Sequence, residues 1–437
     1  MKLFIETFGC QMNISDSEIV ASILDGEGYQ ICGTAAEADL VFLNTCAIRD
    51  NAEQRVRKRL RELSGLKRKQ PGLMIGVLGC MAERMKEQLL EEELMVDLMA
   101  GPDSYRELPA MLLQVSSGQR VANVMLSEAE TYEDLSPVRH HSDGVSAFVS
   151  IMRGCQNFCA YCVVPYTRGK ERSRAPESIV EECRKLMTDG YREVTLLGQN
   201  VNSYHWQGDR SLRFPDLLKE VASAVPSMRI RFATSHPKDI SDELIATIAN
   251  TPNVCHHVHL PAQSGSNRIL HLMNRKYTRE WYLGRVKALR EAMPDVAIST
   301  DLIAGFCSET EEDHMETLSL MRECHFDFAF MFAYSERPGT SAAEKLADDV
   351  PTTVKKRRLN EIITLQQELS LESNKADIGL RFSVLVEGVS KKSDQALFGR
   401  TPQNKVVVFP AGDLKAGDTV DVVIHDCTSA TLLGKTV

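Results

Sequence analysis

The alternation of short β-rich runs with helical runs constrains the fold of this chain more than any other feature. In residues 1–117 this rhythm predicts a parallel sheet with crossover helices. The first helix is expected to begin near Ser15, which forms a capping-box pair with Glu18. The expected strands are residues 2–8, 39–44 and 73–79.

Three cysteines, Cys10, Cys46 and Cys80, each fall at the end of one of these expected strands. Parallel strands end at the same sheet edge, so the three thiols are expected close enough together to ligate one metal centre. Three thiolates on a 4Fe-4S cluster would leave one iron open. The alternative is three ordinary buried cysteines. Recurrence at one topological point favours the metal centre, and Gly9 and Gly79 suit a close approach of the backbone.

The β/α rhythm repeats six times in residues 145–372, which predicts a partial (β/α)6 barrel. Sites in β/α barrels lie at the carboxyl ends of the strands. The expected strands are residues 148–152, 193–197, 229–233, 256–260, 297–302 and 328–333. Residues at their ends include Gln199, Asn200, Ser235, Gln263 and Asp301.

The remaining segments are a connection and a small terminal domain. Residues 118–144 are polar and are interpreted as a linker. A charged helix is expected over 354–374, and residues 375–437 show the short strands of a small OB-like β-barrel, a shape often used for RNA. The expected fold class is therefore α/β, with a parallel N-terminal domain, a central partial barrel and a C-terminal β-barrel.

Composition narrows the functional classes. No apolar stretch approaches the roughly 18 residues of a membrane span, and the acid in the apolar N-terminal run argues against a signal peptide. A cytoplasmic protein without membrane contact is expected, whose twelve cysteines are ligands or buried thiols and not disulfides. Net charge is −9, yet residues 55–69 carry eight basic residues against one acid. Either a solvated helix face or a polyanionic partner explains this run.

A second cysteine triplet, Cys155, Cys159 and Cys162, lies within eight residues after an expected strand. Zinc and an iron–sulfur cluster are the two alternatives for such a motif. A closed zinc site needs a fourth ligand, and no further Cys or His lies nearby.

The C-x3-C-x2-C spacing, with Tyr161 before the last cysteine, resembles the signature of the radical S-adenosylmethionine superfamily. The resemblance implies a 4Fe-4S cluster whose open iron chelates S-adenosylmethionine and cleaves it to a 5′-deoxyadenosyl radical. It also implies cofactor contacts by motif position, although the acid usual in the Gly-Gly-Glu-like turn is missing here. The cofactor-contact candidates are Tyr161, Gln199, Asn200, Ser235 and Gln263.

The three-part layout resembles the methylthiotransferase family along essentially the whole chain. The matching motifs include residues 8–13, 44–46, 163–169, 198–202, 234–237 and 260–266. Cys10-Gln11-Met12-Asn13 is most similar to the branch acting on isopentenyladenosine in tRNA. Residues 305–310 depart from the family pattern, and Cys307 is not assigned to a cluster.

This resemblance implies insertion of sulfur and a methyl group at C2 of N6-isopentenyladenosine, 3′ of the anticodon. It further implies a second 4Fe-4S cluster on Cys10, Cys46 and Cys80, an electron donor such as flavodoxin or ferredoxin, a sulfur donor, a TRAM-like RNA-binding barrel and a monomeric enzyme. The alternatives are methylthiolation of threonylcarbamoyladenosine in tRNA or of a ribosomal-protein aspartate, and a non-catalytic iron–sulfur RNA-binding protein. The expected RNA contacts are Arg55, Arg57, Lys58, Arg61, Arg168 and Arg400.

Overall fold

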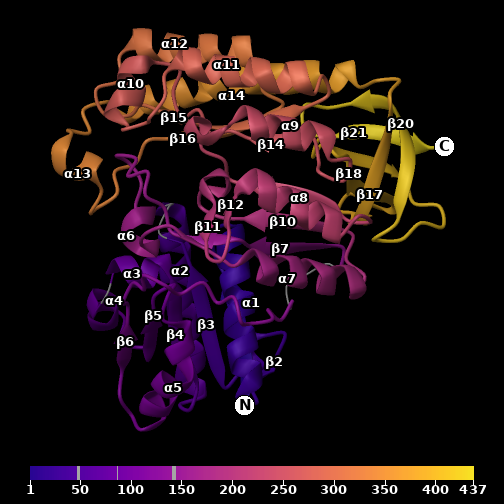
Figure 1. Ribbon diagram of the computed structural model, residues 1–437. Coiled ribbons are helices and arrows are strands. Elements are labelled where there is room, and N and C mark those ends of the chain that lie inside the picture. Colours follow the sequence, from indigo (N-terminus) through magenta and orange to yellow (C-terminus); the bar gives the residue numbers. More distant parts are fainter. Residues whose placement is uncertain (47–49, 86, 140–143) are drawn as a thin grey trace.

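The computed structural model describes residues 1–46, 50–85, 87–139 and 144–437. Three bodies follow one another along the chain (Figure 1). An α/β domain at the N-terminus packs against an open barrel of parallel strands, and a small closed β-barrel lies at the far end. The expected fold class is confirmed.

The N-terminal domain is built on a fully parallel six-stranded sheet in the order β2-β1-β3-β4-β5-β6. Helices α1 and α5 cover one face, and α2, α3 and α4 cover the other. The central strand β3 is wholly buried, as its unbroken apolar run requires. The strands are β1 (Lys2–Thr7), β2 (Gln30–Ile31), β3 (Leu40–Thr45), β4 (Met74–Gly79), β5 (Leu98–Ala100) and β6 (Val121–Asn123). The helices are α1 (Gln11–Gly26), α2 (Asp50–Lys69), α3 (Cys80–Met85), α4 (Glu87–Glu92) and α5 (Leu108–Ser116).

The first helix begins earlier than the capping box predicts. The carbonyl of Cys10 already accepts the backbone N–H of Asn13 at 2.9 Å, so α1 starts at Gln11. Ser15 and Glu18 are buried inside the helix, and the Glu18 carboxylate pairs with Arg139. The predicted cap at Ser15 is therefore wrong, because the helix begins four residues earlier and Glu18 pairs with Arg139 instead.

Residues 118–144 are not a simple solvated spacer. Residues 121–123 form β6, the edge strand of the first sheet. Tyr132 is buried against Tyr105, with the two rings stacked at a centroid distance of 5.8 Å. The N-terminal domain thus extends into the expected linker, of which residues 140–143 lie outside the described part.

The central body is an open barrel made of two parallel three-stranded sheets, β7-β10-β13 and β14-β15-β16. A parallel bridge between Ile230 and Val254 joins them. Its strands are β7 (Ser146–Ser150), β10 (Glu193–Leu197), β13 (Arg229–Ala233), β14 (His257–His259), β15 (Ala297–Ala304) and β16 (Phe328–Ala333). The helices on its outer side are α7 (Pro176–Thr188), α8 (Phe214–Ala224), α9 (Asp242–Asn250), α11 (Arg279–Ala292), α12 (Glu311–Cys324) and α14 (Thr352–Ala376).

Short elements decorate this barrel. Two antiparallel pairs lie in its loops, β8 (Met152–Arg153) with β9 (Arg172–Ser173) and β11 (His205–Gln207) with β12 (Ser211–Arg213). The short helices are α6 (Val164–Arg168), α10 (Asn267–Leu272) and α13 (Ser341–Lys345).

The C-terminal barrel closes in the order β17-β18-β19-β21-β20. Its strands are β17 (Arg381–Ser390), β18 (Ser393–Arg400), β19 (Val406–Pro410), β20 (Thr419–Cys427) and β21 (Leu432–Thr436). The sequence pattern predicts strands at residues 382–389, 405–409 and 419–425, which correspond to β17, β19 and β20. It misses β18, which begins on polar residues, and β21, which ends on them. Arg231 on β13 docks this barrel by donating to the backbone carbonyls of Thr401 and Pro402 at 2.8 and 3.0 Å.

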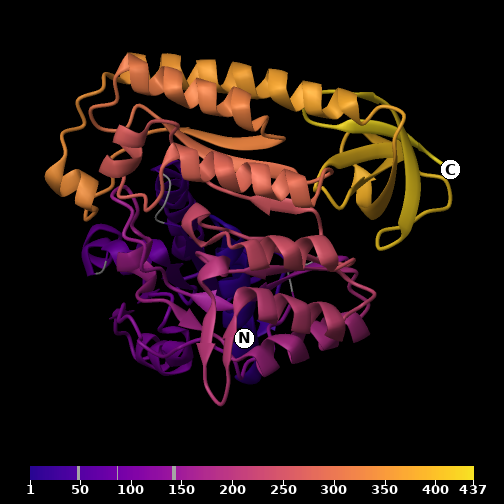
Figure 2. The same cartoon turned by 45° about the horizontal axis from the view of Figure 1, so that its top comes forward.

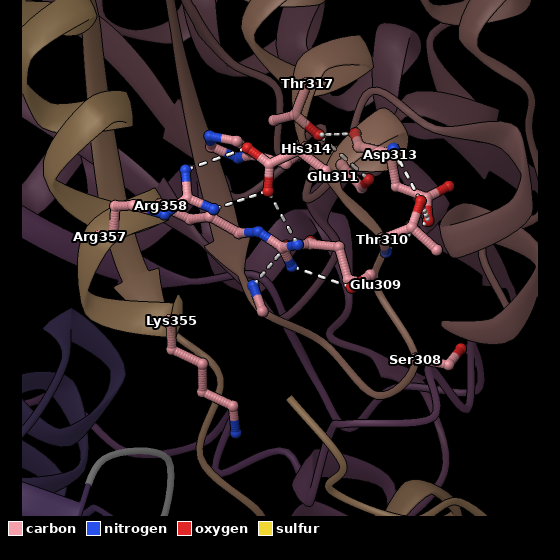
Figure 3. A network of polar contacts seen from close by, with 12 residues as sticks. Ser308, Glu309, Thr310, Glu311, Asp313, His314, Thr317, Lys355, Arg357 and Arg358 are labelled. Carbon is pink, nitrogen blue, oxygen red and sulfur yellow. Dashed lines mark hydrogen bonds and ion pairs between the residues drawn. The ribbon is translucent and has the colours of Figure 1, made fainter. Parts of the chain in front are cut away.

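Helix α14 runs from the loops at the carboxyl ends of the strands to the C-terminal barrel (Figures 1 and 2). Figure 3 shows its basic residues facing the loop after β15. Arg358 donates to the Glu309 carboxylate at 3.0 Å, and Glu309 accepts the N–H of Gly305 at 2.8 Å. Lys355 donates to the carbonyl of Tyr334 after β16 at 3.3 Å. One helix therefore holds two loops at the end of the barrel where a site is expected.

Candidate metal and cofactor site

The first cysteine triplet lies at one edge of the N-terminal sheet, as the strand pattern predicts. Cys10, Cys46 and Cys80 follow β1, β3 and β4, which are neighbours in the sheet. Gly9 has a φ of +141°, and a Cβ there would stand 2.6 Å from the Cys46 Cβ. The close backbone approach expected at Gly9 is therefore confirmed, because any side chain at this position would press into the cysteines.

The surroundings of this triplet favour the thiolate of Cys10, the form in which cysteine binds metals. Hydrogen bonding with Cys46, supported by the positive charge of Arg168, lowers the pKa of Cys10 to about 6. Burial raises the pKa of Cys80, although Arg168 donates its Nε–H to the Cys80 Sγ at 3.2 Å.

The second triplet lies in the loop between β8 and α6. The Nδ2 of Asn157 donates to the Cys155 Sγ at 3.4 Å, and a guanidinium nitrogen of Arg275 donates to the Cys159 Sγ at 3.3 Å. Burial, together with the charges of Cys159 and Cys155, raises the pKa of Cys162 to about 12. Such mutual repulsion is offset when a cation binds between thiolates.

The two triplets are adjacent in space although they belong to different domains. Val163, which follows Cys162, packs on Cys80. Helices α3 and α6 lie in contact at this point. Arg337, in the loop after β16, interacts electrostatically with Cys46. The loop after the last strand of the barrel therefore also lies near the first triplet. The loops of both domains therefore converge on the six cysteines.

Neither triplet is arranged for a single metal ion. Over residues 1–46, 50–85, 87–139 and 144–437, no three His, Cys, Asp or Glu side chains are grouped to hold one ion. A four-iron cluster is larger than an ion and takes its thiolates at separate corners. The chemistry of the donors, three thiols per group without a fourth ligand, fits such a cluster better than zinc.

Two of the cofactor-contact candidates present unused polar atoms at the strand ends. Both amide atoms of Gln199 and the Oγ of Ser235 are buried without a hydrogen-bond partner in the described part of the chain. Buried polar groups are normally paired. These two side chains are therefore suited to contact a polar ligand.

The other candidates already have roles within the protein. Asn200 donates to Asp239 at 2.8 Å and accepts the N–H of His236 at 3.0 Å, so it holds the loop after β13. Gln263 is buried with a φ of +67°, and its backbone joins β15. The hydroxyl of Tyr161 accepts from Arg275 at 3.4 Å. Cys307 is buried in an apolar cluster, in agreement with leaving it outside the triplets.

The basic residues expected to contact RNA divide into two groups. Arg55, Lys58 and Arg61 are exposed on α2. Arg57 is paired with Glu92 at 2.9 Å, and Arg400 is paired with Glu387 at 3.0 Å.

The RNA-contact prediction for Arg168 is wrong. Its side chain is only 3% exposed, pairs with Asp16 at 2.7 Å and donates to Cys80.

Arg275 was not expected at the site at all, because it follows the short helix α10, away from the strand ends. No sequence pattern marks it.

A buried ion network joins the N-terminal domain to the barrel beneath the cysteines. Asp16 on α1 pairs with Arg153 at 2.9 Å and with Arg168 at 2.7 Å. Asp103 pairs with Arg172 at 2.9 Å. These carboxylates are fully buried, so the network fixes how the two domains meet.

Comparisons with known proteins agree with this architecture. The family model of the radical SAM superfamily matches residues 149–321, a range that contains the second triplet. The model described as "Uncharacterized protein family UPF0004" matches residues 2–101, and that of the TRAM domain matches residues 375–437. No helix among the described residues has both the length and the apolar character to cross a membrane.

Curated relatives match along the whole chain. A tRNA-2-methylthio-N(6)-dimethylallyladenosine synthase from Phocaeicola vulgatus is 60% identical over 100% of this chain and 96% of its own length. Proteins of the same name from Amoebophilus asiaticus and Chloroherpeton thalassium are 57% and 55% identical, each over 99% of this chain and over 92% and 95% of their own lengths. The chain belongs to the tRNA-2-methylthio-N(6)-dimethylallyladenosine synthase family.

Solved structures share the fold at low identity. The radical S-adenosylmethionine methyltransferase TsrM from Kitasatospora setae, with cobalamin and a 4Fe-4S cluster bound, superposes with a TM-score of 0.60 at 13% identity. The match covers 78% of this chain and 77% of that one. The cobalamin-dependent radical enzyme OxsB gives a TM-score of 0.57 at 12% identity, over 84% of this chain and 56% of that one.

Proposed function

We propose that this protein inserts sulfur and a methyl group at C2 of N6-dimethylallyladenosine (isopentenyladenosine) in tRNA. The family supports this substrate, since its curated members carry the name of that activity. The observation that carries the proposal is the adjacency of the two cysteine triplets across α3 and α6. Radical formation and sulfur delivery can then act on one base without a long transfer.

The residues present fit two clusters and one cofactor. Cys155, Cys159 and Cys162 would hold one 4Fe-4S cluster, which when loaded supplies the electron that cleaves S-adenosylmethionine to a carbon radical. Gln199 and Ser235 would orient the polar groups of S-adenosylmethionine, because their buried atoms have no partner in the described chain.

The remaining triplet would serve the sulfur chemistry. Cys10, Cys46 and Cys80 would hold the second 4Fe-4S cluster, where the sulfur to be transferred resides. An electron donor such as flavodoxin or ferredoxin and a sulfur donor complete the proposed system. We place this system in the cytoplasm, with the protein acting as a monomer.

The inner face of the second half-barrel offers an apolar surface for the dimethylallyl group. In the parallel register of β15 and β16, Phe330 lies beside Asp301 on one face of the sheet. Ala329 and Met331 lie on the other face, in the apolar core between the sheet and the surrounding helices. Phe328 and Phe330 are 50% and 44% exposed, and their rings meet edge to face at 4.9 Å. Exposed aromatic surface within a concave face is typical of a ligand site.

Replacing Phe330 with alanine should therefore weaken use of dimethylallylated tRNA. We expect kcat/KM to fall about 10- to 100-fold, because a lost apolar contact of this size is worth about 1 to 3 kcal/mol. The matched control is Met315→Ala, which removes an exposed apolar side chain from α12. Equal kcat/KM in the Phe330 variant and the unchanged protein would exclude this surface from the substrate site.

The exposed basic residues of α2 are proposed to bind the tRNA backbone. Replacing Arg55, Lys58 and Arg61 with glutamate should lower the affinity for tRNA. The slope of the logarithm of the association constant against the logarithm of salt concentration should become less steep by up to about 3, since each phosphate contact contributes about 0.9. Fluorescence anisotropy over a salt series measures both quantities.

The control for this experiment reverses three exposed basic residues on the outer barrel helices, namely Lys287, Arg322 and Lys356. Cleavage of S-adenosylmethionine should persist in both variants. An unchanged affinity after reversal on α2 would show that the tRNA binds elsewhere. Deleting the C-terminal barrel is a poorer test, because buried Arg231 would lose two backbone acceptors.

The substrate assignment is tested by offering three substrates to the reconstituted protein. These are tRNA carrying dimethylallyladenosine, tRNA carrying threonylcarbamoyladenosine, and the ribosomal protein. Mass spectrometry should find a methylthio product on the first substrate only. A product on either other substrate would overturn the assignment, and cleavage without any product would leave only the radical chemistry. No 5′-deoxyadenosine at all would favour a non-catalytic iron–sulfur protein.

A further inference from the structure

Each cysteine triplet has one buried arginine that donates a hydrogen bond to a cysteine sulfur. Arg168 donates its Nε–H to Cys80 at 3.2 Å, and Arg275 donates to Cys159 at 3.3 Å. The two residues are only 3% and 9% exposed. Two guanidinium groups thus occupy corresponding positions, one beside each proposed cluster.

The two arginines differ in what balances their charge. Arg168 pairs with the fully buried carboxylate of Asp16 at 2.7 Å. The other partners of Arg275 are neutral, with the hydroxyl of Tyr277 at 3.0 Å and the carbonyl of Pro261 at 3.0 Å. In the described chain, no carboxylate forms an ion pair with Arg275. The positive charge of Arg275 therefore has no carboxylate beside it, whereas that of Arg168 is partly offset by Asp16, which also pairs with Arg153.

We propose that Arg275 is a positioning residue that raises the reduction potential of the cluster on the second triplet, and that Arg168, which has a carboxylate partner, affects the first cluster less. The inference rests on the proposed function, because it requires the two clusters. Reduction adds one negative charge to a cluster, so an unbalanced cation nearby stabilises the reduced form. A hydrogen bond to a ligand sulfur acts in the same direction, and both arginines provide one.

The test measures the midpoint potential of each cluster separately. In full-length protein with Cys10, Cys46 and Cys80 replaced by alanine, only the second triplet can be loaded. The Arg275→Gln substitution is made in this background. The Arg168→Gln substitution is made with Cys155, Cys159 and Cys162 replaced instead. Redox titration of the anaerobically reconstituted proteins is followed by electron paramagnetic resonance.

We expect Arg275→Gln to shift the midpoint potential to a more negative value, and Arg168→Gln to shift that of the first cluster less. Arg275→Lys keeps the charge and should retain most of the potential. The control is Arg290→Gln, because Arg290 donates to the backbone carbonyls of Cys324 and His325. This variant should leave both midpoint potentials unchanged. Equal shifts for the two arginines, or no shift in Arg275→Gln, would overturn the proposal.

Iron and sulfide counts on every variant show whether a cluster is assembled. If the Arg275→Gln variant binds no iron, the Arg275→Lys variant provides the test. A midpoint potential that is lowered in Arg275→Lys, which keeps the positive charge, would contradict the inference. The readout requires neither tRNA nor a methylthio product. If the protein acts on another substrate, the proposed function is refuted but the midpoint potentials are unchanged. A protein that loads no cluster in either set of cysteine variants would refute both the proposed function and this inference.

Discussion

Replacing Cys155, Cys159 and Cys162 together with alanine is expected to abolish formation of 5′-deoxyadenosine. The iron and sulfide bound per chain should fall by half, because the other triplet would keep the second cluster that we propose there. Anaerobic reconstitution, metal analysis and chromatography of the cleavage products measure these quantities. This is the largest effect on activity that we expect, since the cluster proposed on this triplet is the one that supplies the electron to S-adenosylmethionine.

The matched control removes three cysteines that lie in the apolar core, Cys183, Cys255 and Cys324. Serving only as small buried hydrophobic residues, they should leave the iron content unchanged when replaced with alanine. Zinc in place of iron, or full iron content in the variant without the second triplet, would refute the cluster assignment.

The largest effect on stability is expected for Asp16→Ala. This substitution leaves Arg153 and Arg168 buried without their shared carboxylate, and removing one partner of a buried ion pair costs about 3 to 5 kcal/mol. Neighbouring charges support this view, because the two guanidiniums hold the pKa of Asp16 below its usual value despite its burial. Chemical denaturation of the metal-free protein should show a markedly lower midpoint.

The control is Glu128→Ala at the exposed pair with Lys170, where solvent screens the charges and no shift is expected. If both variants unfold at the same denaturant concentration as the unchanged protein, the network under the cysteines does not hold the domains together. The Asp16 effect should also persist in a protein lacking the first triplet, because it arises from the ion pairs and not from the cluster.

The placement of the cysteines was largely predictable because it depends on local patterns. Apolar runs mark the strands, parallel strands end at one edge, and Cys10, Cys46 and Cys80 follow three such strands. The same reasoning located most strands of the central barrel, with β10, β13 and β16 beginning and ending where expected. It was less successful for β18 and β21, because each includes polar residues that weaken the periodic signal.

By itself, then, the sequence determined the order of the domains, most strands of the central barrel and the two cysteine triplets. Only the tertiary structure decided that the triplets are adjacent, that Arg168 faces Cys80 and Asp16 instead of solvent, and that Arg275 reaches Cys159. The physical reason is that periodicity reports which face of an element is buried, whereas contacts between separate domains depend on how complete elements pack. A buried arginine and a surface arginine look alike in a sequence until the carboxylate that pairs with one of them is found.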